Sequence, residues 1–193
     1  MTETVRRART RRQSDLLDRL VALLAAEGFA RFTLDDLAAR MHCSKTTLYA
    51  LADSKADLVV EVVKQYFRRA VETVEERVAG VDDPRERVAT YLEAVAEHLR
   101  PLSRAFMDDL LGFPPAAAVY RANTTAASDR VRALVADGVT HGAFRPVHAA
   151  FVGEVVAATM AEIQGGRLHE RLGMSDSEAY AELASLVVHA LQP

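Results

Sequence analysis

Residues 44–49, which read SKTTLY, concentrate side chains that can hydrogen-bond to a polyanion. The hydroxyls, the lysine and the phenol of this segment can reach base edges or phosphate oxygens without steric obstruction. Ser44 also suits the N-cap of a short helix that runs to about Ala50, and the amide groups at such an N-terminus are further donors for phosphate. The segment is therefore a candidate nucleic-acid contact.

A second short helix precedes this segment and would determine how it is presented. Thr33 is a candidate N-cap with Asp36 three residues later, an arrangement like a capping box, and it predicts a helix over 34–40. A break at 41–43 separates the two short helices. An apolar stripe predicts a longer helix at 11–27 before them, and Ser54 with Asp57 caps a long helix after them that reaches about Ala79. Two short helices packed between two longer ones have the dimensions of a helix-turn-helix.

The rest of the chain is also predicted to be helical. Apolar residues recur at spacings of three and four almost everywhere, and strand signals are nearly absent, so the pattern predicts an all-α protein of about nine helices. Beyond a boundary at 80–83, caps and breakers predict helices at 84–99, 101–111, 115–140, 147–170 and 176–191.

The charge of the chain is distributed unevenly. The 193 residues carry a formal charge of −3, which by itself gives no indication of a nucleic-acid partner. Residues 1–69, however, hold 13 basic and 9 acidic side chains, whereas residues 70–193 hold 11 basic and 18 acidic ones. Within residues 1–12 the basic side chains are Arg6, Arg7, Arg9, Arg11 and Arg12. Such an arm suits attraction to a polyanion, although charge alone is equally consistent with a solvated tail.

Several stretches together resemble the DNA-binding domain of the tetracycline-repressor (TetR) family of bacterial transcription regulators. They are FTLDDLA at 32–38, SKTTLY at 44–49 and SKADL at 54–58, with the EGF turn at 27–29 before them. The resemblance covers about residues 11–60. It implies a flexible basic arm, a helix-turn-helix domain and a C-terminal domain for effector binding and dimerisation. We expect these units at 1–12, at 13–60 with a last helix that extends to about 79, and at 61–193.

The resemblance also implies a role for each matching residue. Thr33 would bond a phosphate, Lys45, Thr46 and Thr47 would face bases or the adjacent backbone, and Tyr49 would reach a phosphate or a base. Lys55 would contact phosphate from the start of the fourth helix. The full set of expected DNA-contacting residues is Thr33, Ser44, Lys45, Thr46, Thr47, Tyr49, Lys55, Arg11 and Arg12.

Three residues depart from the family pattern. His42 stands in the turn where the family usually has glycine, and histidine tolerates left-handed dihedral angles better than most residues do. Leu51 and Ala52 replace a polar or aromatic residue and an aromatic residue that usually follow the tyrosine. These changes bear on one phosphate contact and on the packing of the third helix against the fourth.

The segment 91–120 is the candidate lining of a small-molecule pocket. Pockets between helices have mostly apolar walls with a few polar groups that orient the ligand. Plain hydrophobic core is the alternative for any one of these residues. The expected ligand-binding residues are His98, Phe106, Met107, Leu110, Phe113 and Tyr120.

The last two predicted helices carry small residues that would allow close helix approach. They are Ala149, Ala150, Gly153, Ala157, Ala158 and Ala161 in one helix and Ala181, Ala184 and Ala190 in the other. Packing within one chain is the alternative. The family resemblance favours a homodimer through these helices, because two-fold pairing presents two recognition helices to two half-sites.

Other classes of function lack a signal in the sequence. One cysteine, Cys43, excludes an intramolecular disulfide framework, and no histidine pair has metal-ligand spacing, so no metal or cofactor is expected. No catalytic motif is present, and an enzyme is not expected. Without an export signal or an apolar stretch of membrane-spanning length, the predicted location is the cytoplasm.

The sequence thus predicts a ligand-responsive transcriptional regulator, a repressor, that binds a double-stranded inverted-repeat operator as a homodimer. The partners expected are this DNA and a small-molecule effector. A helical small-molecule-binding protein of the same fold that has lost sequence-specific DNA binding is the alternative.

Overall fold

The computed structural model describes residues 10–191, which form ten α-helices and no strand. This confirms the all-α prediction. The helices are α1 (Arg11–Glu27), α2 (Leu34–Met41), α3 (Lys45–Tyr49), α4 (Lys55–Ala79), α5 (Pro84–Leu99), α6 (Arg104–Gly112), α7 (Pro114–Thr140), α8 (Ala149–Gln164), α9 (Arg167–Leu172) and α10 (Asp176–Leu191). No helix of these described residues is long and apolar enough to cross a membrane.

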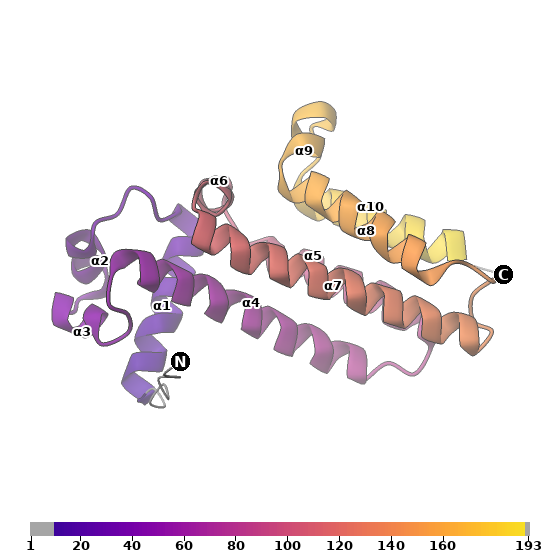
Figure 1. Ribbon diagram of the computed structural model, residues 1–193, viewed down its shortest axis with the longest axis horizontal. Coiled ribbons are helices and arrows are strands. Elements are labelled where there is room, and N and C mark those ends of the chain that lie inside the picture. The colour runs from indigo at the N-terminus through magenta and orange to yellow at the C-terminus, as the bar shows by residue number, and fades with distance from the viewer. Residues whose placement is uncertain (1–9, 192–193) are drawn as a thin grey trace, which may run out of the picture.

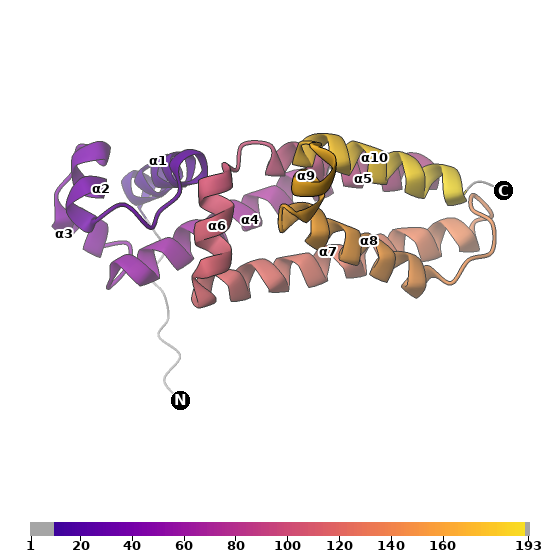
Figure 2. The same ribbon diagram turned by 90° about the horizontal axis from the view of Figure 1, so that it is seen from above.

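The molecule is elongated, with the helix-turn-helix at one end (Figure 1). We call α1, α2, α3 and residues 55–67 of α4 the head, and residues 68–191 the body. Helix α4 runs from the head into the body, where it packs against α5 and α7, while α8 packs on α7 and α10 packs on α5 and α8. Helix α6 crosses between the head and the long helices of the body (Figure 2).

Local hydrogen bonds begin each helix of the head. Thr33 and Asp36 form a reciprocal capping box at α2, as the sequence predicts. The Ser44 and Ser54 side chains accept from backbone amides in the first turns of α3 and α4. Because each cap satisfies amides that no helical carbonyl can reach, these short polar residues fix where the helices start.

The turn between α2 and α3 requires a left-handed residue. His42 has φ 51° and ψ 48°, and within residues 10–191 it is the single non-glycine residue with positive φ. Its backbone amide bonds back to the carbonyls of Ala38 and Ala39 and ends α2. The histidine therefore serves in the left-handed position that glycine would occupy with less strain.

The head shares one hydrophobic core with α6 and the start of α7. Buried leucines of α1, α2 and α3 belong to the same cluster as Phe106, Met107 and Leu110 of α6 and Ala116 and Tyr120 of α7. A second cluster joins the rest of α4 to α5, α7, α8 and α10. The apolar packing of the head thus extends into a segment that follows it by some forty residues in the chain.

The predicted helix over 147–170 was wrong, because the structure has two helices there. Helix α8 ends at Gln164, and Gly166 adopts φ 74° before α9 begins at Arg167. A left-handed glycine stops a helix, so the Gly165-Gly166 pair was the sequence signal for this boundary. With α9 the described residues form ten helices rather than about nine.

Replacing His42 by glycine should stabilise the protein. Glycine avoids the cost of a left-handed side-chain-bearing residue but gives the unfolded chain more freedom, so we expect a net gain of about 0.5–1 kcal/mol in unfolding free energy. Chemical denaturation at a fixed protein concentration measures this change. His141→Gly is the matched control, because His141 ends α7 with φ −86° and glycine there relieves no strain. A loss of stability in His42→Gly would contradict the prediction.

Candidate functional site

The α3 helix is short and is held by a single buried side chain. Leu48 is 1% exposed and packs in the head core, while Lys45, Thr46 and Tyr49 lie on the solvent side. Five residues are too few for a helix to be stable by itself, so its position depends on the cap at Ser44 and on Leu48. The result is a rigidly placed helix whose polar face is free to meet another molecule.

Tyr49 is the most conspicuous residue on this face. It is 49% exposed and stands at the C-terminal end of α3. Thr46 is exposed beside it, whereas Thr47 is half-buried and its hydroxyl lies 2.8 Å from that of Ser44. A tyrosine here offers a ring to pack on sugar or base and a hydroxyl to bond phosphate.

Lys45 is already paired in the free protein. Its Nζ lies 2.7 Å from Oδ1 of Asp35 in α2, and this hydrogen bond raises the pKa of the lysine. The ammonium group therefore stays charged across the physiological range. Both side chains are solvent-exposed, so the pair is weak enough for a phosphate to take the place of the carboxylate.

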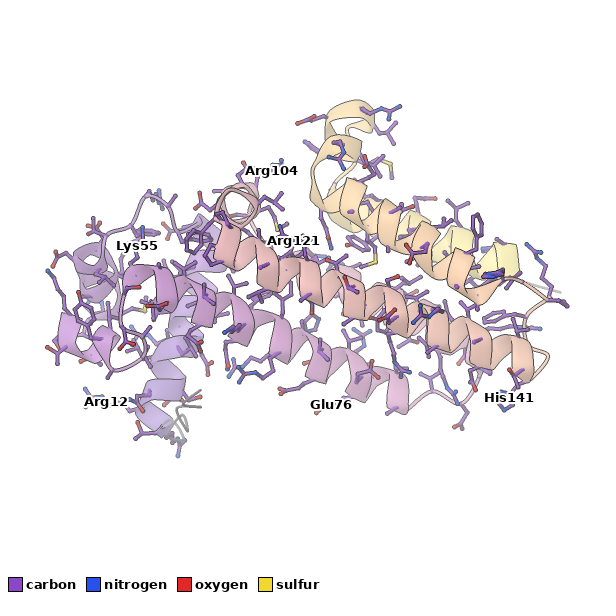
Figure 3. The ribbon with its side chains drawn as sticks, viewed as in Figure 1. Arg12, Lys55, Glu76, Arg104, Arg121 and His141 are labelled. Atoms are coloured by element: carbon purple, nitrogen blue, oxygen red, sulfur yellow. The ribbon has the colours of Figure 1, made fainter. Side chains whose placement is uncertain are left out.

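Thr33 and Lys55, both expected to contact phosphate, have partners within the head. The hydroxyl and the backbone amide of Thr33 both donate to the Asp36 carboxylate, and these two hydrogen bonds lower the pKa of that carboxyl group. Lys55 Nζ donates to the Ala30 carbonyl over 3.1 Å and lies beside the loop between α1 and α2 (Figure 3). In this conformation Lys55 secures that loop.

The basic residues at the start of the head divide into two groups. Arg11 and Arg12 are exposed in the first turn of α1, and Arg12 projects outward from it (Figure 3). Arg6, Arg7 and Arg9 lie outside the described residues. The described part of the arm thus places positive charge on the side of α1 where the chain enters the head.

Two polar residues that sequence reasoning missed tie α1 to the helix-turn-helix. Gln13 Nε2 donates to the Ala50 carbonyl at the end of α3, over 3.3 Å. Arg19 donates to the Met41 carbonyl at the end of α2, over 3.1 Å. Both bonds satisfy carbonyls at helix C-termini, and they link residues too distant in sequence for a pattern to reveal.

Asp109 of α6 was also missed, and it connects the body to the head. Its Oδ2 accepts from the backbone amides of Phe29 and Ala30, at 2.5 and 2.7 Å. Gly28, with φ 76°, precedes these amides, and a Cβ atom there would lie 2.7 Å from the same carboxylate oxygen. Glycine is therefore required both for the turn and for the approach of Asp109. We call these two bonds the Asp109 contact.

A cavity of about 100 Å³ lies between α4, α5, α7 and α8. Its wall is mainly apolar and aromatic, with Tyr66 and Val74 from α4, Tyr91 from α5, Ala127 from α7 and Met160 from α8 among the lining residues. Burial raises the pKa of Tyr66 to about 12 and also raises that of Tyr91. Both phenols are thus neutral hydrogen-bond donors in the wall.

The cavity includes one of the six expected ligand-binding residues, His98. Phe106, Met107, Leu110 and Tyr120 are instead buried in the core shared by head and body. Phe113 borders a different hollow, between α6, the α1–α2 loop and the start of α4. The sequence could not separate these cases, because residues that line a pocket and residues that fill a core show the same apolar spacing along a helix.

The outer face of α8 and α10 is apolar and unusually exposed. Phe151 and Leu186 are each 67% exposed, with Val155 and Leu172 nearby in the lining of the same hollow. Large apolar side chains gathered in this way mark an interaction surface. We call this surface the α8–α10 face.

The small residues of α8 are used in part within the chain. A Cβ atom on Gly153 would lie 3.1 Å from the Arg132 Cβ, so this glycine lets α8 approach α7. Ala184 is buried in the body core, whereas Ala158 and Ala161 are exposed. The alternative of intrachain packing therefore holds for Gly153 and Ala184.

Metal binding and thiol chemistry find no support in residues 10–191. No group of three or more histidine, cysteine, aspartate or glutamate side chains among them could hold a metal ion. Cys43 is half-buried and packs against the head core as a small apolar residue.

The fold and site define an all-helical protein with a helix-turn-helix head on a larger helical body, a class that binds duplex DNA through its second short helix. Residues 16–62 match the model of the family described as bacterial regulatory proteins, tetR family. Residues 16–62 of the head are therefore similar to the DNA-binding domain of this family. No curated protein matches the chain.

Solved structures with the same fold cover nearly the whole chain. A transcriptional regulator from Cytophaga hutchinsonii is 16% identical over 94% of this chain and 99% of its own, with a TM-score of 0.76. A putative transcriptional regulator from Saccharomonospora viridis, solved in complex with choline, is 17% identical over 94% and 98%, with a TM-score of 0.78. The TetR-family regulator PfmR from Thermus thermophilus is 22% identical over 92% and 99%, with a TM-score of 0.65.

Loss of the Asp109 contact should loosen the head. In Asp109→Ala two amides lose a charged acceptor, and we expect an unfolding free energy lower by about 1–3 kcal/mol. Hydrogen–deuterium exchange of Phe29 and Ala30 measures the local effect, and denaturation measures the global one. Asp108→Ala is the matched control, because Asp108 makes an exposed ion pair with Arg104. Equal effects of the two variants would refute the role given to Asp109.

Proposed function

We propose that this protein is a ligand-responsive transcriptional repressor that binds a palindromic operator as a homodimer. The observation that carries the proposal is the exposed polar face of α3 within a segment that matches the tetR family. The alternative, a ligand-binding protein of this fold without sequence-specific DNA binding, has the same body. A DNA-binding measurement separates the two. Such a regulator acts where the chromosome is, in the cytoplasm, and needs no catalytic activity.

The head suits the major groove. In a helix-turn-helix the second helix enters the groove by its N-terminal residues while the first lies across the backbone. Lys45 and Thr46 stand at that N-terminus, and Tyr49 extends the contact along the groove edge. Thr33, Ser44, Lys55 and the arginines of the arm would then bond phosphates on either side, which sets orientation rather than sequence preference.

Dimerisation through the α8–α10 face would supply the second half-site. A single five-residue recognition helix reads few base pairs, so specific binding needs two heads. Burying Phe151 and Leu186 against a second copy removes apolar surface that the monomer leaves in water. In a two-fold symmetric dimer, each subunit would contribute this same face to the interface.

The cavity would bind the effector and act on the head through α4 and α6. The Tyr66 hydroxyl donates to the His98 carbonyl, and the Tyr66 ring lies 6.3 Å from that of Phe106 in α6. The Phe106 ring in turn lies 6.0 Å from that of Phe29 beside the Asp109 contact. A ligand that shifts Tyr66 would thus move groups that hold the head. Because coupling is reciprocal, operator DNA must weaken effector binding by the same factor.

DNA binding is tested by selecting bound sequences from genomic fragments. We expect the selected sequences to share an inverted repeat. On a selected fragment, Thr47→Ala or Tyr49→Ala should weaken binding about 5- to 100-fold, because each loses a direct contact to the duplex. Gel-shift titration measures the change, and circular dichroism verifies folding.

Two further variants make this test specific. Thr125→Ala, which removes an exposed hydroxyl from α7, is the control and should bind as the parent protein does. Replacing Arg11 and Arg12 by glutamine should reduce the salt dependence of binding, by a slope of roughly 0.9 for each lost phosphate contact, on random DNA as well. Unchanged binding in all of the head variants would refute DNA recognition by this head.

Disruption of the α8–α10 face should produce monomers. Phe151→Arg or Leu186→Arg places a charge in the proposed interface, and we expect the dimer dissociation constant to rise at least about tenfold. Sedimentation equilibrium measures it. Leu111→Arg is the matched control, because Leu111 is an exposed leucine on α6, away from this face. A parent protein that is monomeric at micromolar concentration would contradict the proposal.

A further inference from the structure

A buried polar atom in the cavity wall has no hydrogen-bond partner. Gln164 at the end of α8 is 5% exposed and lines the cavity. Its Nε2 donates to the Tyr180 hydroxyl, whereas its Oε1 has no hydrogen-bond partner. A buried amide oxygen without a partner carries a desolvation cost that a bound donor would remove. Gln164 therefore indicates where a ligand places a polar group.

The hydroxyl groups of the tyrosines and of Thr124 around the cavity already donate hydrogen bonds to backbone carbonyls. Tyr66 donates to the His98 carbonyl, Tyr91 to the Ala127 carbonyl at 3.5 Å, and Thr124 to the Tyr120 carbonyl at 3.1 Å. His98 directs Nδ1 at the Ala94 carbonyl, 3.1 Å away, and a carbonyl can only accept. In the neutral ring this leaves Nε2 as an acceptor. The unused capacity of Gln164 and His98 is thus for accepting hydrogen bonds.

The charged residues of the wall neutralise each other. Arg130 donates from Nε and Nη2 to the two carboxylate oxygens of Glu75, at 2.8 and 2.7 Å. A bidentate pair of this kind holds both ions in a fixed geometry. An anionic ligand would have to displace Glu75 from Arg130, and a cationic ligand would have to displace Arg130 from Glu75. The wall therefore favours an uncharged ligand.

The remaining surface and the size of the cavity restrict the ligand further. Val74, Val95, Met160 and the rings of Phe67 and Tyr91 form an apolar enclosure. A volume of about 100 Å³ is of the order of cavities that hold a single benzene ring, roughly 150 Å³. A ligand of one ring or a short chain fits such a space without rearrangement of the helices.

We propose that this cavity binds a small uncharged molecule of one ring or a short aliphatic chain that carries a hydroxyl group, with the hydroxyl donating to Gln164 Oε1. The apolar part of the molecule lies among the side chains of α4, α5 and α7. This proposal rests on the effector role given to the cavity above and names the chemical class of the effector.

Binding of phenol, toluene and benzoate to the full-length protein tests the proposal. The three probes share a ring and differ in the group that reaches Gln164. Isothermal titration calorimetry should show phenol binding at least about fivefold more tightly than toluene, because only phenol donates to the unpaired oxygen. Benzoate should bind more weakly than phenol, because its carboxylate oxygens are hydrogen-bond acceptors and would face Gln164 Oε1, which is also an acceptor. Toluene or benzoate binding as tightly as phenol would overturn the proposal.

Gln164→Leu provides the matching variant. It keeps the apolar bulk and removes the amide, so phenol should lose its advantage over toluene while toluene binding is retained. Thr125→Val, on the exposed side of α7, should keep the phenol-to-toluene ratio of the parent. If Gln164→Leu fails to fold, the series on the parent protein decides alone. No binding by phenol overturns this inference, whereas the proposed function fails separately, by absence of salt-dependent binding to the selected DNA.

Discussion

The two bonds from Asp109 to the amides of Phe29 and Ala30 are the contact on which the orientation of the head most directly depends. The α1–α2 loop has few other polar anchors, and Lys55 supplies one of them through the Ala30 carbonyl. These bonds lie at the edge of the core that joins the leucines of the head to the buried face of α6, with the bond to Phe29 part-buried and the bond to Ala30 exposed. The angle between head and body is therefore set by α6 as well as by α4.

This arrangement gives the cavity two routes to the head. One is α4 itself, which carries Tyr66 in the cavity wall and Leu58 in the head core. The other passes from Tyr66 to Phe106 and on to Phe29 through ring contacts. Packed rings resist small displacements together, because interiors are close-packed. A change of one side-chain position at Tyr66 would therefore be felt at Phe29 in the α1–α2 loop.

The parts of the fold that depend on neighbours in sequence could be predicted, and the parts that depend on distant neighbours could not. The capping box of Thr33 with Asp36 and the left-handed turn at His42 follow from residues within one turn of each other. Asp109 accepts hydrogen bonds from amides that lie 79 and 80 residues away in the sequence, and no local sequence pattern indicates these bonds. Likewise Phe106 and His98 lie in similar apolar surroundings in the sequence, yet one is in the core and the other lines the cavity. That difference arises only when α5 and α6 take their places against α4.

The shared core has a consequence for recombining such proteins. Giving this body a new DNA specificity would require exchange of a discontinuous unit. The reason is that α1 to α4 share one hydrophobic core with α6 and the start of α7. A chimera joined at one point after α3 would set a foreign loop against Asp109 and leave Phe106 facing side chains of another shape. Transplantation of 11–67 together with 104–120 preserves both surfaces, because the head, α6 and the start of α7 form one structural unit that is discontinuous in the sequence.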